Sequence, residues 1–290
     1  MPILKKPNKK PLKILGVIGN PVSHSLSPLM QNAALAKLKL PYLYKAFELT
    51  QKELKKFTTT LIQENIIGFN VTIPHKENIT RYLDQLTPEA KLMGAVNTVY
   101  RRGNRLVGDN TDGRGYLNSL LKEARFNPKK EVIVILGAGG AAKGISLALA
   151  REKPRELIIV NRTLTKAQSL KKQIQIHNKK LVVSAVSLED MQIINWSTVS
   201  LLVNTTSVGL KTKGTFLIPF KKCNKKLIVS DIVYAPALTP FLRRAKKNGL
   251  KIHYGWGMLL YQGALAFELF TGKKAPINLM KKVLLEALKE

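Results

Sequence analysis

A glycine-rich turn at mid-chain constrains the fold more than any other feature of these 290 residues. The apolar, β-branched run 132–136 leads directly into Gly137, Gly139 and Ala142, which matches the strand–G-x-G-x-x-A–helix turn of a dinucleotide site. The first glycine permits a tight turn, the second lets backbone N–H groups approach a pyrophosphate, and the alanine lets helix and strand pack closely. The helix N-terminus then faces the phosphates with its positive dipole end. A turn of this kind at mid-chain predicts a second domain in the residues before it.

The residues after the next apolar run, 157–160, indicate which dinucleotide is bound. In NAD sites an Asp or Glu near this place holds the ribose 2′-hydroxyl. Here the run ends in Asn161, with no carboxylate beside it. Arg162, Thr163 and Lys166 instead suit a 2′-phosphate, so the sequence favours NADP over NAD. One alternative stays open, because a basic chain also places solvated residues such as Arg162 and Lys166 at helix starts.

The net charge restricts the partners. At +30 it is large enough to suggest nucleic-acid binding. The lysines are spread over the whole chain, however, and no motif combining aromatic and basic residues appears. We therefore predict no nucleic-acid partner, and we expect the charge to attract anionic small molecules such as a phosphate-bearing cofactor and an acidic substrate.

Cysteine usage and hydropathy indicate the compartment. The single Cys223 excludes an internal disulfide and fits a reducing cytoplasm, and its lysine-rich surroundings predict a surface thiol. The longest apolar stretch, 257–270, is too short to span a bilayer, and no segment has signal-peptide form. The histidines lack metal-ligand spacing. We expect a cytoplasmic protein with no membrane partner and no metal.

Alternating strand and helix patterns predict an α/β fold of two domains. In the first half we expect strands at 13–18, 43–48 and 68–73, helices at 27–38, 51–64 and 88–93, and a hairpin of 97–101 with 105–108. Ser27 is able to cap the helix in which Pro28 takes the first position.

The second half predicts a parallel, doubly wound Rossmann-type sheet, because its strands are separated by helices. The expected strands are 132–136, 157–160, 181–186, 200–203, 226–230 and 250–253, followed by helices at 258–270 and 276–288. We divide the chain into a basic tail at 1–12, a substrate domain at 13–125 completed by 258–290, and an NADP-binding domain at 126–257.

Polar residues gather where the predicted strands end, which is where open α/β sheets bind ligands. Taken singly, such residues are explained by helix caps, Asx turns or solvation. Taken together, their hydroxyls, amides, one lysine and one carboxylate converge on one cleft and suit a small polyhydroxylated acid. In the first half they are Ser25, Ser27, Asn70, Thr72, Lys76, Asn97, Asn110 and Asp112, and in the second half Asn204, Thr205, Asp231 and Tyr234.

Several motifs carry a resemblance to a known family. They are GNPVSHSLSP at 19–28, NVTIPHK at 70–76, GAVNT at 94–98, GDNTDG at 108–113, GAGGA at 137–141, NRT at 161–163, GMLLYQGA at 257–264 and FELFTG at 267–272. In this order the chain resembles the shikimate dehydrogenase family, from about residue 15 to the last helix.

The resemblance implies NADP-linked, reversible reduction of 3-dehydroshikimate to shikimate in aromatic amino-acid biosynthesis. By matching positions, Lys76 and Asp112 would form the catalytic pair. The substrate carboxylate would be held by Ser25, Ser27 and Tyr234, and the ring hydroxyls by Asn70, Thr72, Asn97 and Gln262. The residues matching the cofactor site are Gly137, Ala138, Gly139, Gly140, Ala141, Asn161, Arg162, Thr163, Lys166, Thr205, Gly257 and Met258.

The chemistry of ketone reduction fits this pair. Negative charge develops on the carbonyl oxygen, and a lysine both stabilises that charge and supplies a proton. The chain departs from the family pattern at Lys166, where arginine is common, and at His75, which replaces an aromatic residue and for which we expect a packing or rim role.

Three alternatives stay open at this point. One is a quinate/shikimate dehydrogenase that uses NAD or both cofactors, another is a binding protein that has lost catalysis, and the third is a nucleic-acid binder. The sequence leaves open whether the chain is a monomer or a homodimer.

Overall fold

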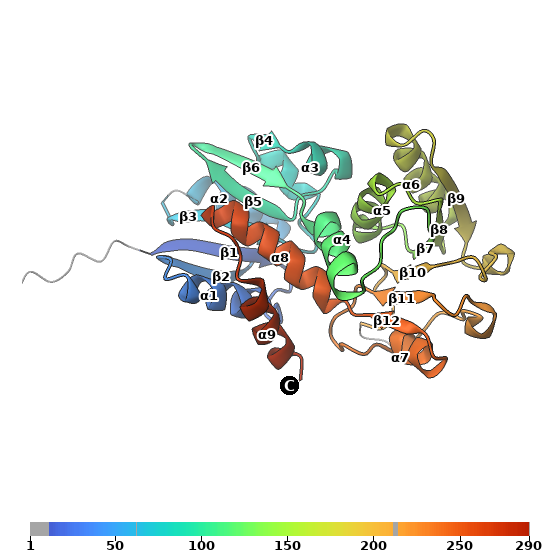
Figure 1. Ribbon diagram of the computed structural model, residues 1–290. Coiled ribbons are helices and arrows are strands. Elements are labelled where there is room, and N and C mark those ends of the chain that lie inside the picture. Colours follow the sequence, from blue (N-terminus) through green and yellow to red (C-terminus); the bar gives the residue numbers. More distant parts are fainter. Residues whose placement is uncertain (1–11, 62, 211–213, 290) are drawn as a thin grey trace, which may run out of the picture.

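Two six-stranded sheets form the framework of the residues that this computed structural model describes, which are 12–61, 63–210 and 214–289 (Figure 1). The predicted basic tail, except for its last residue, lies outside them. None of the helices in the described ranges is both long and apolar enough to cross a bilayer.

The first sheet has the strand order β2-β1-β3-β5-β6-β4. Its strands are β1 (Lys13–Gly19), β2 (Tyr42–Glu48), β3 (Ile66–Val71), β4 (Gln85–Leu86), β5 (Thr98–Arg102) and β6 (Arg105–Asp109). β1 is parallel to β2 and β3, whereas β5 runs antiparallel to β3 and β6. The accompanying helices are α1 (Ser27–Lys37), α2 (Leu54–Thr60) and α3 (Pro88–Met93), with 3₁₀ turns η1 (Gln51–Glu53) and η2 (Asn78–Tyr82).

The second sheet is entirely parallel, with the order β12-β11-β10-β7-β8-β9. Its strands are β7 (Val132–Leu136), β8 (Glu156–Asn161), β9 (Val182–Ser187), β10 (Leu201–Asn204), β11 (Ile228–Asp231) and β12 (Lys251–His253). The helices are α5 (Gly140–Arg151), α6 (Leu164–His177) and α7 (Pro240–Lys247), with 3₁₀ turns η3 (Met191–Ile193) and η4 (Phe220–Lys222). The strand order reverses between β7 and β10, which is the switch point where such sheets bind ligands.

Three further helices remain: α4 (Asp112–Glu123) and α8 (Trp256–Thr271), which join the two halves, and α9 (Ile277–Ala287). α4 packs against both α8 and α5, while α8 also contacts β3 and β5 of the first sheet and α9 packs against α1. In Figure 1 the orange-red α8 accordingly runs from the second sheet back along the first. The carboxyl-terminal helices thus complete the layer on the amino-terminal sheet.

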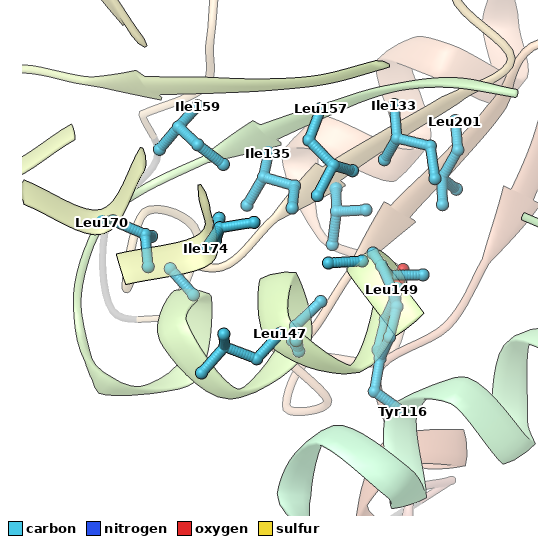
Figure 2. Close-up of a cluster of buried hydrophobic side chains, with 14 of the residues drawn as sticks. Tyr116, Ile133, Ile135, Leu147, Leu149, Leu157, Ile159, Leu170, Ile174 and Leu201 are labelled. Atoms are coloured by element: carbon cyan, nitrogen blue, oxygen red, sulfur yellow. The ribbon is translucent and has the colours of Figure 1, made fainter. Parts of the chain in front are cut away.

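Apolar side chains on both faces of the second sheet hold it between layers. β7 reads VIVIL and is buried along its whole length, which is typical of a central parallel strand. Figure 2 shows Ile133 and Ile135 of β7 in one cluster with Leu149 of α5, and Tyr116 of α4 lies at the rim of this cluster. α4 therefore shares the core of the second sheet, which fixes its first residue, Asp112, relative to that sheet.

Local signals explain how the first sheet presents its polar residues. The Thr87 hydroxyl accepts a hydrogen bond from the Ala90 N–H at 3.3 Å, and Pro88 occupies the first turn of α3. Gly94 ends this helix in the left-handed region, with φ of 59°. The chain then turns directly into β5, which places Asn97 at the entry of that strand.

The structure confirms the α/β fold class with two sheets and corrects three expectations about helices. Ser27 does not cap α1, because the N-cap residue is Leu26 and no side chain caps it. The predicted helix over 51–64 consists of η1 followed by α2, which ends at Thr60. Among the described residues, the connections from β9 to β10 and from β10 to β11 contain only 3₁₀ turns instead of the helices that we expected.

Cys223 was expected to be a surface thiol, and this is wrong. Its side chain is buried in the same apolar cluster as Trp196, Ile218 and Phe220. The neighbouring lysines are exposed, so the polarity of the sequence neighbours did not reveal the inward direction of this one side chain. Burial raises the pKa of the Cys223 thiol to about 11, which makes it a poor nucleophile.

Candidate active site

A cleft of about 430 Å³ lies where strands of the two sheets end, which is within the usual size range of small-molecule sites. Both predicted catalytic residues and all seven predicted substrate-binding residues line it. They are Ser25, Ser27, Asn70, Thr72, Lys76, Asn97, Asp112, Tyr234 and Gln262. Residues separated by more than two hundred positions in the sequence therefore face one space.

Lys76 and Asp112 form an ion pair in this cleft, with 2.6 Å between Nζ and Oδ2. Lys76 follows the third strand of the first sheet, and Asp112 is the first residue of α4, so the pair joins two elements that end at the cleft. The Asp112 side chain is 11% exposed and that of Lys76 is 31% exposed. The carboxylate is therefore largely withdrawn from water, while the lysine remains accessible to a ligand.

Asn97 holds the other oxygen of this carboxylate. Its Nδ2 donates to Asp112 Oδ1 at 2.7 Å and to Thr111 Oγ1 at 3.0 Å, and it lies 3.4 Å from Gln262 Oε1. Its Oδ1 accepts from the Thr111 N–H at 2.8 Å. Because these bonds use most of its hydrogen-bonding capacity, Asn97 orients the Asp112 carboxylate and links the start of β5 to α4 and α8.

The hydroxyls of Ser25, Ser27 and Tyr234 also line the cleft. The Ser25 hydroxyl accepts from the Ser27 N–H at 3.3 Å, which ties the loop to the start of α1. Burial raises the pKa of Tyr234, so its phenol stays protonated and able to donate. Three hydroxyl donors in one place are suited to binding a carboxylate.

The turn between β7 and α5 has the backbone geometry that the sequence predicted. Gly137 has φ of 112°, and a Cβ there would lie 2.6 Å from Thr205 Oγ1. A Cβ at Gly139 or Gly140 would meet nothing within 4 Å. The N–H groups at the start of α5 therefore border open space beside the cleft, as a pyrophosphate requires. Ala142 is fully buried and packs in the core beneath the turn.

The residues predicted to choose the cofactor lie where β8 ends and α6 begins. Arg162, Thr163 and Lys166 are exposed, and Asn161 Nδ2 donates to the Thr163 carbonyl at 2.9 Å. β8 is the direct neighbour of β7, so these side chains lie at the same sheet edge as the glycine turn.

Two predicted cofactor residues of α8 differ in their surroundings. Met258 lines the cleft together with Ala141 of the glycine-rich turn. Gly257 is buried against α4, and a Cβ there would lie 2.0 Å from Ser119 Oγ. Gly257 therefore has a packing role, because it lets α8 approach α4 closely.

Two residues of the site escaped the sequence analysis as individual candidates, namely Tyr44 and Thr111. Thr111 lies inside the motif at 108–113, which was a usable signal. Tyr44 lies in β2, and its hydroxyl reaches Asn70, which is 26 positions away. No sequence pattern connects these two residues.

Comparisons with known proteins identify the family of the chain. The chain matches three family models, described as shikimate dehydrogenase substrate binding domain over residues 17–99, shikimate / quinate 5-dehydrogenase over 120–233, and shikimate 5'-dehydrogenase C-terminal domain over 255–285. It is 41% identical to the shikimate dehydrogenase (NADP(+)) of Methanopyrus kandleri, over 95% of this chain and 96% of that relative.

Two crystal structures are similar over almost the whole chain. One is a shikimate dehydrogenase in complex with NADP+, with a TM-score of 0.89 and 36% identity over 96% of each chain. The other is the shikimate 5-dehydrogenase of Thermus thermophilus in complex with NADP(H) and shikimate, with a TM-score of 0.81, 36% identity, and coverage of 96% of this chain and 100% of that one. By its fold, its motifs and its relatives, the chain belongs to the shikimate dehydrogenase family.

Proposed function

We propose that this chain catalyses the NADP-dependent, reversible reduction of 3-dehydroshikimate to shikimate. The observation that carries the proposal is the cleft itself, in which one lysine–aspartate pair, four hydroxyls and several amides face one space. The residues at the glycine turn fit a dinucleotide, because the space beside Gly139 and Gly140 is open and the N-terminus of α5 faces it. When bound, NADPH supplies the hydride for the reduction.

Lys76 is the residue we propose as proton donor. As the ketone is reduced, charge develops on its oxygen, and an ammonium group placed there stabilises that charge and then transfers a proton to it. Asp112 holds the ammonium group at 2.6 Å, and Asn97 fixes the carboxylate from its other side. In the oxidative direction the neutral amine of Lys76 takes the proton back.

The remaining residues of the cleft orient the substrate. We propose that Ser25, Ser27 and Tyr234 hold the carboxylate, and that Asn70, Thr72 and Gln262 contact ring hydroxyls. A cleft that binds both the carboxylate and the hydroxyls of the substrate holds the ring in one orientation, so that a single carbon faces the proposed catalytic pair.

For the cofactor, the exposed Arg162, Thr163 and Lys166 favour the 2′-phosphate of NADP. We propose that these three side chains, with Asn161 and the turn from Gly137 to Ala141, hold NADP, and that Met258 lies near the nicotinamide. Thr205, whose hydroxyl donates to the Leu136 carbonyl at 2.6 Å, supports the turn.

Three broader features belong to the same proposal. We place the substrate domain at 13–125 with 258–290, and the NADP domain at 126–257, since α8 and α9 pack on the first sheet. A single free cysteine supports a cytoplasmic location, and the active form is a monomer or a homodimer.

The proposal is tested by measuring turnover with NADP or NAD, each paired with shikimate or quinate. We expect rapid turnover only with NADP and shikimate. Comparable rates with NAD or quinate would move the chain to the broader quinate/shikimate activity. No turnover with any pair, from folded protein that still binds NADP, would contradict the enzymatic assignment.

A further inference from the structure

Tyr44 is a buried residue that does not line the cleft but contacts Asn70, which does. It lies in β2 and is 2% exposed, and its hydroxyl lies 2.7 Å from Asn70 Oδ1. β1 separates β2 from β3 in the sheet, so the phenol crosses an entire strand to reach Asn70, which is itself 6% exposed and lines the cleft. Burial raises the pKa of Tyr44 well above its usual range, so the hydroxyl remains protonated.

The hydrogen bonds around Asn70 fix the orientation of its amide. The Asn97 backbone carbonyl, which can only accept, lies 3.1 Å from Asn70 Nδ2. Thr98 Oγ1 accepts from the same nitrogen at 3.0 Å and gives its own hydrogen to Asn97 Oδ1 at 2.9 Å. The amide nitrogen therefore faces β5, the oxygen faces Tyr44, and the Tyr44 hydroxyl is the donor in their bond.

This arrangement limits what Asn70 offers a ligand. An amide nitrogen has two hydrogens, and both are used within the protein. The oxygen has two lone pairs, of which Tyr44 occupies one. Only the second lone pair is free, so Asn70 can accept a hydrogen bond from a ligand but cannot donate one.

We propose that Tyr44 is a positioning residue for the substrate, which locks Asn70 as a hydrogen-bond acceptor for one non-reacting hydroxyl of the shikimate ring. This inference rests on the function proposed above. It explains how the site distinguishes a hydroxyl, which can donate, from a carbonyl or ether oxygen at that carbon. Without the Tyr44 hydroxyl, the Asn70 amide nitrogen keeps its hydrogen bonds to Asn97 and Thr98. The Asn70 oxygen, however, loses the hydrogen bond that fixes its orientation.

The first test is the Tyr44→Phe variant, which keeps the buried ring and removes only the donor. We expect KM for shikimate to rise about three- to tenfold, the range of a single hydrogen bond, with kcat and KM for NADP nearly unchanged. The matched control is Tyr261→Phe, which removes the Tyr261 hydroxyl bond to Glu123 outside the cleft lining and should leave KM for shikimate unchanged. Wild-type KM for shikimate in Tyr44→Phe would overturn the proposal.

Substrate analogues separate positioning from general loosening of the fold. The analogues each lack one non-reacting hydroxyl of shikimate. The analogue without the hydroxyl that binds Asn70 should have the same affinity for wild type and for Tyr44→Phe, because its hydrogen bond to Asn70 is absent in both proteins. An equal penalty of the variant on every analogue would overturn the proposal. Inactive wild-type protein would instead refute the proposed function.

A crystal structure of the wild-type protein with shikimate gives a result that does not depend on the folding of any variant. We expect a ring hydroxyl within hydrogen-bonding distance of Asn70 Oδ1 while the bond from Tyr44 persists. A substrate oxygen bonded to Asn70 Nδ2, with the amide turned away from Tyr44, would overturn the proposal.

Discussion

At the scale of single residues, the cleft is organised around one fully partnered carboxylate. Asp112 bonds Lys76 through one oxygen and Asn97 through the other, so its orientation is fixed before a substrate arrives. The ammonium group of Lys76 is the accessible member of the pair. This preorganisation predicts that chemistry depends on Lys76 more strongly than binding does.

For Lys76→Ala we expect kcat to fall by about 10²- to 10⁴-fold, the usual contribution of a positioned proton donor, and the Kd of shikimate to change far less. Steady-state kinetics and calorimetric titration measure the two quantities. Lys91→Ala, which changes an exposed lysine in α3, serves as the control and should behave as wild type. Normal turnover in Lys76→Ala would remove this residue from the mechanism.

Arg162 is expected to set the cofactor preference. Arg162→Ala should raise KM for NADP by about tenfold or more while KM for NAD changes little, because only NADP carries the phosphate that a guanidinium binds. The control is Lys172→Ala, which removes one positive charge at an exposed position further along α6. Equal effects of the two variants on NADP would indicate general attraction by a basic surface instead of a specific contact.

At the scale of elements, the glycine turn can be tested by two alanine substitutions that differ in kind. Gly137→Ala places a Cβ at positive φ, 2.6 Å from Thr205 Oγ1, so we expect loss of both stability and NADP binding. Gly139→Ala meets no protein atom within 4 Å and has φ of −88°, so it should fold normally yet bind NADP more weakly. Thermal melting measures the stability of each variant, and titration with NADP measures its affinity. Equal destabilisation by the two substitutions would contradict this account.

β12 carries a buried histidine whose titration couples to stability. His253 lies 2.9 Å from Ser230 Oγ and 2.8 Å from Ser119 Oγ, and burial lowers its pKa to about 4. The unfolded chain, with a histidine pKa of about 6.5, therefore binds more protons between these values. The stability contributed by neutral His253 is complete above about pH 6.5 and is lost as the pH falls toward 4.

Asp231 acts in the opposite direction, since burial raises its pKa to about 6 and it therefore adds stability as the pH falls. Comparing wild type with His253→Asn isolates the histidine, because Asp231 is common to both. From about pH 7.5 to about pH 5, the free energy of unfolding of wild type should fall by about 2 kcal/mol relative to the variant, as measured by urea denaturation. A pH-independent difference would show that His253 does not titrate in this way.

The elements also show how far the sequence alone could lead. The runs at β1, β7 and β8 were predictable because central parallel strands are continuously apolar, and the turn at Gly137 because its geometry demands glycine. The connections around β10 were not, since their described residues form only short 3₁₀ turns, which have no periodic pattern. Tyr44 and Cys223 could not be placed either, because their environments are made by residues distant in the chain.

At the scale of the whole molecule, two sheets and the helices between them place one cleft beside one glycine turn. α4 shares the core of the second sheet and begins with Asp112, whereas Lys76 lies in the loop after β3 of the first sheet. The ion pair of Lys76 and Asp112 therefore joins the two halves of the molecule. The net charge of +30 favours the approach of an anionic acid and a phosphorylated cofactor to this cleft.

The most direct test of this account follows the hydride itself. Shikimate carrying deuterium on the carbon that is oxidised is incubated with NADP and the purified protein, and the NADPH formed is analysed by mass spectrometry. We predict that each NADPH molecule carries the deuterium, and that its formation depends on Lys76. NADPH formed without deuterium, or labelled NADPH formed at the wild-type rate by Lys76→Ala, would contradict direct hydride transfer in this cleft with Lys76 as its proton donor.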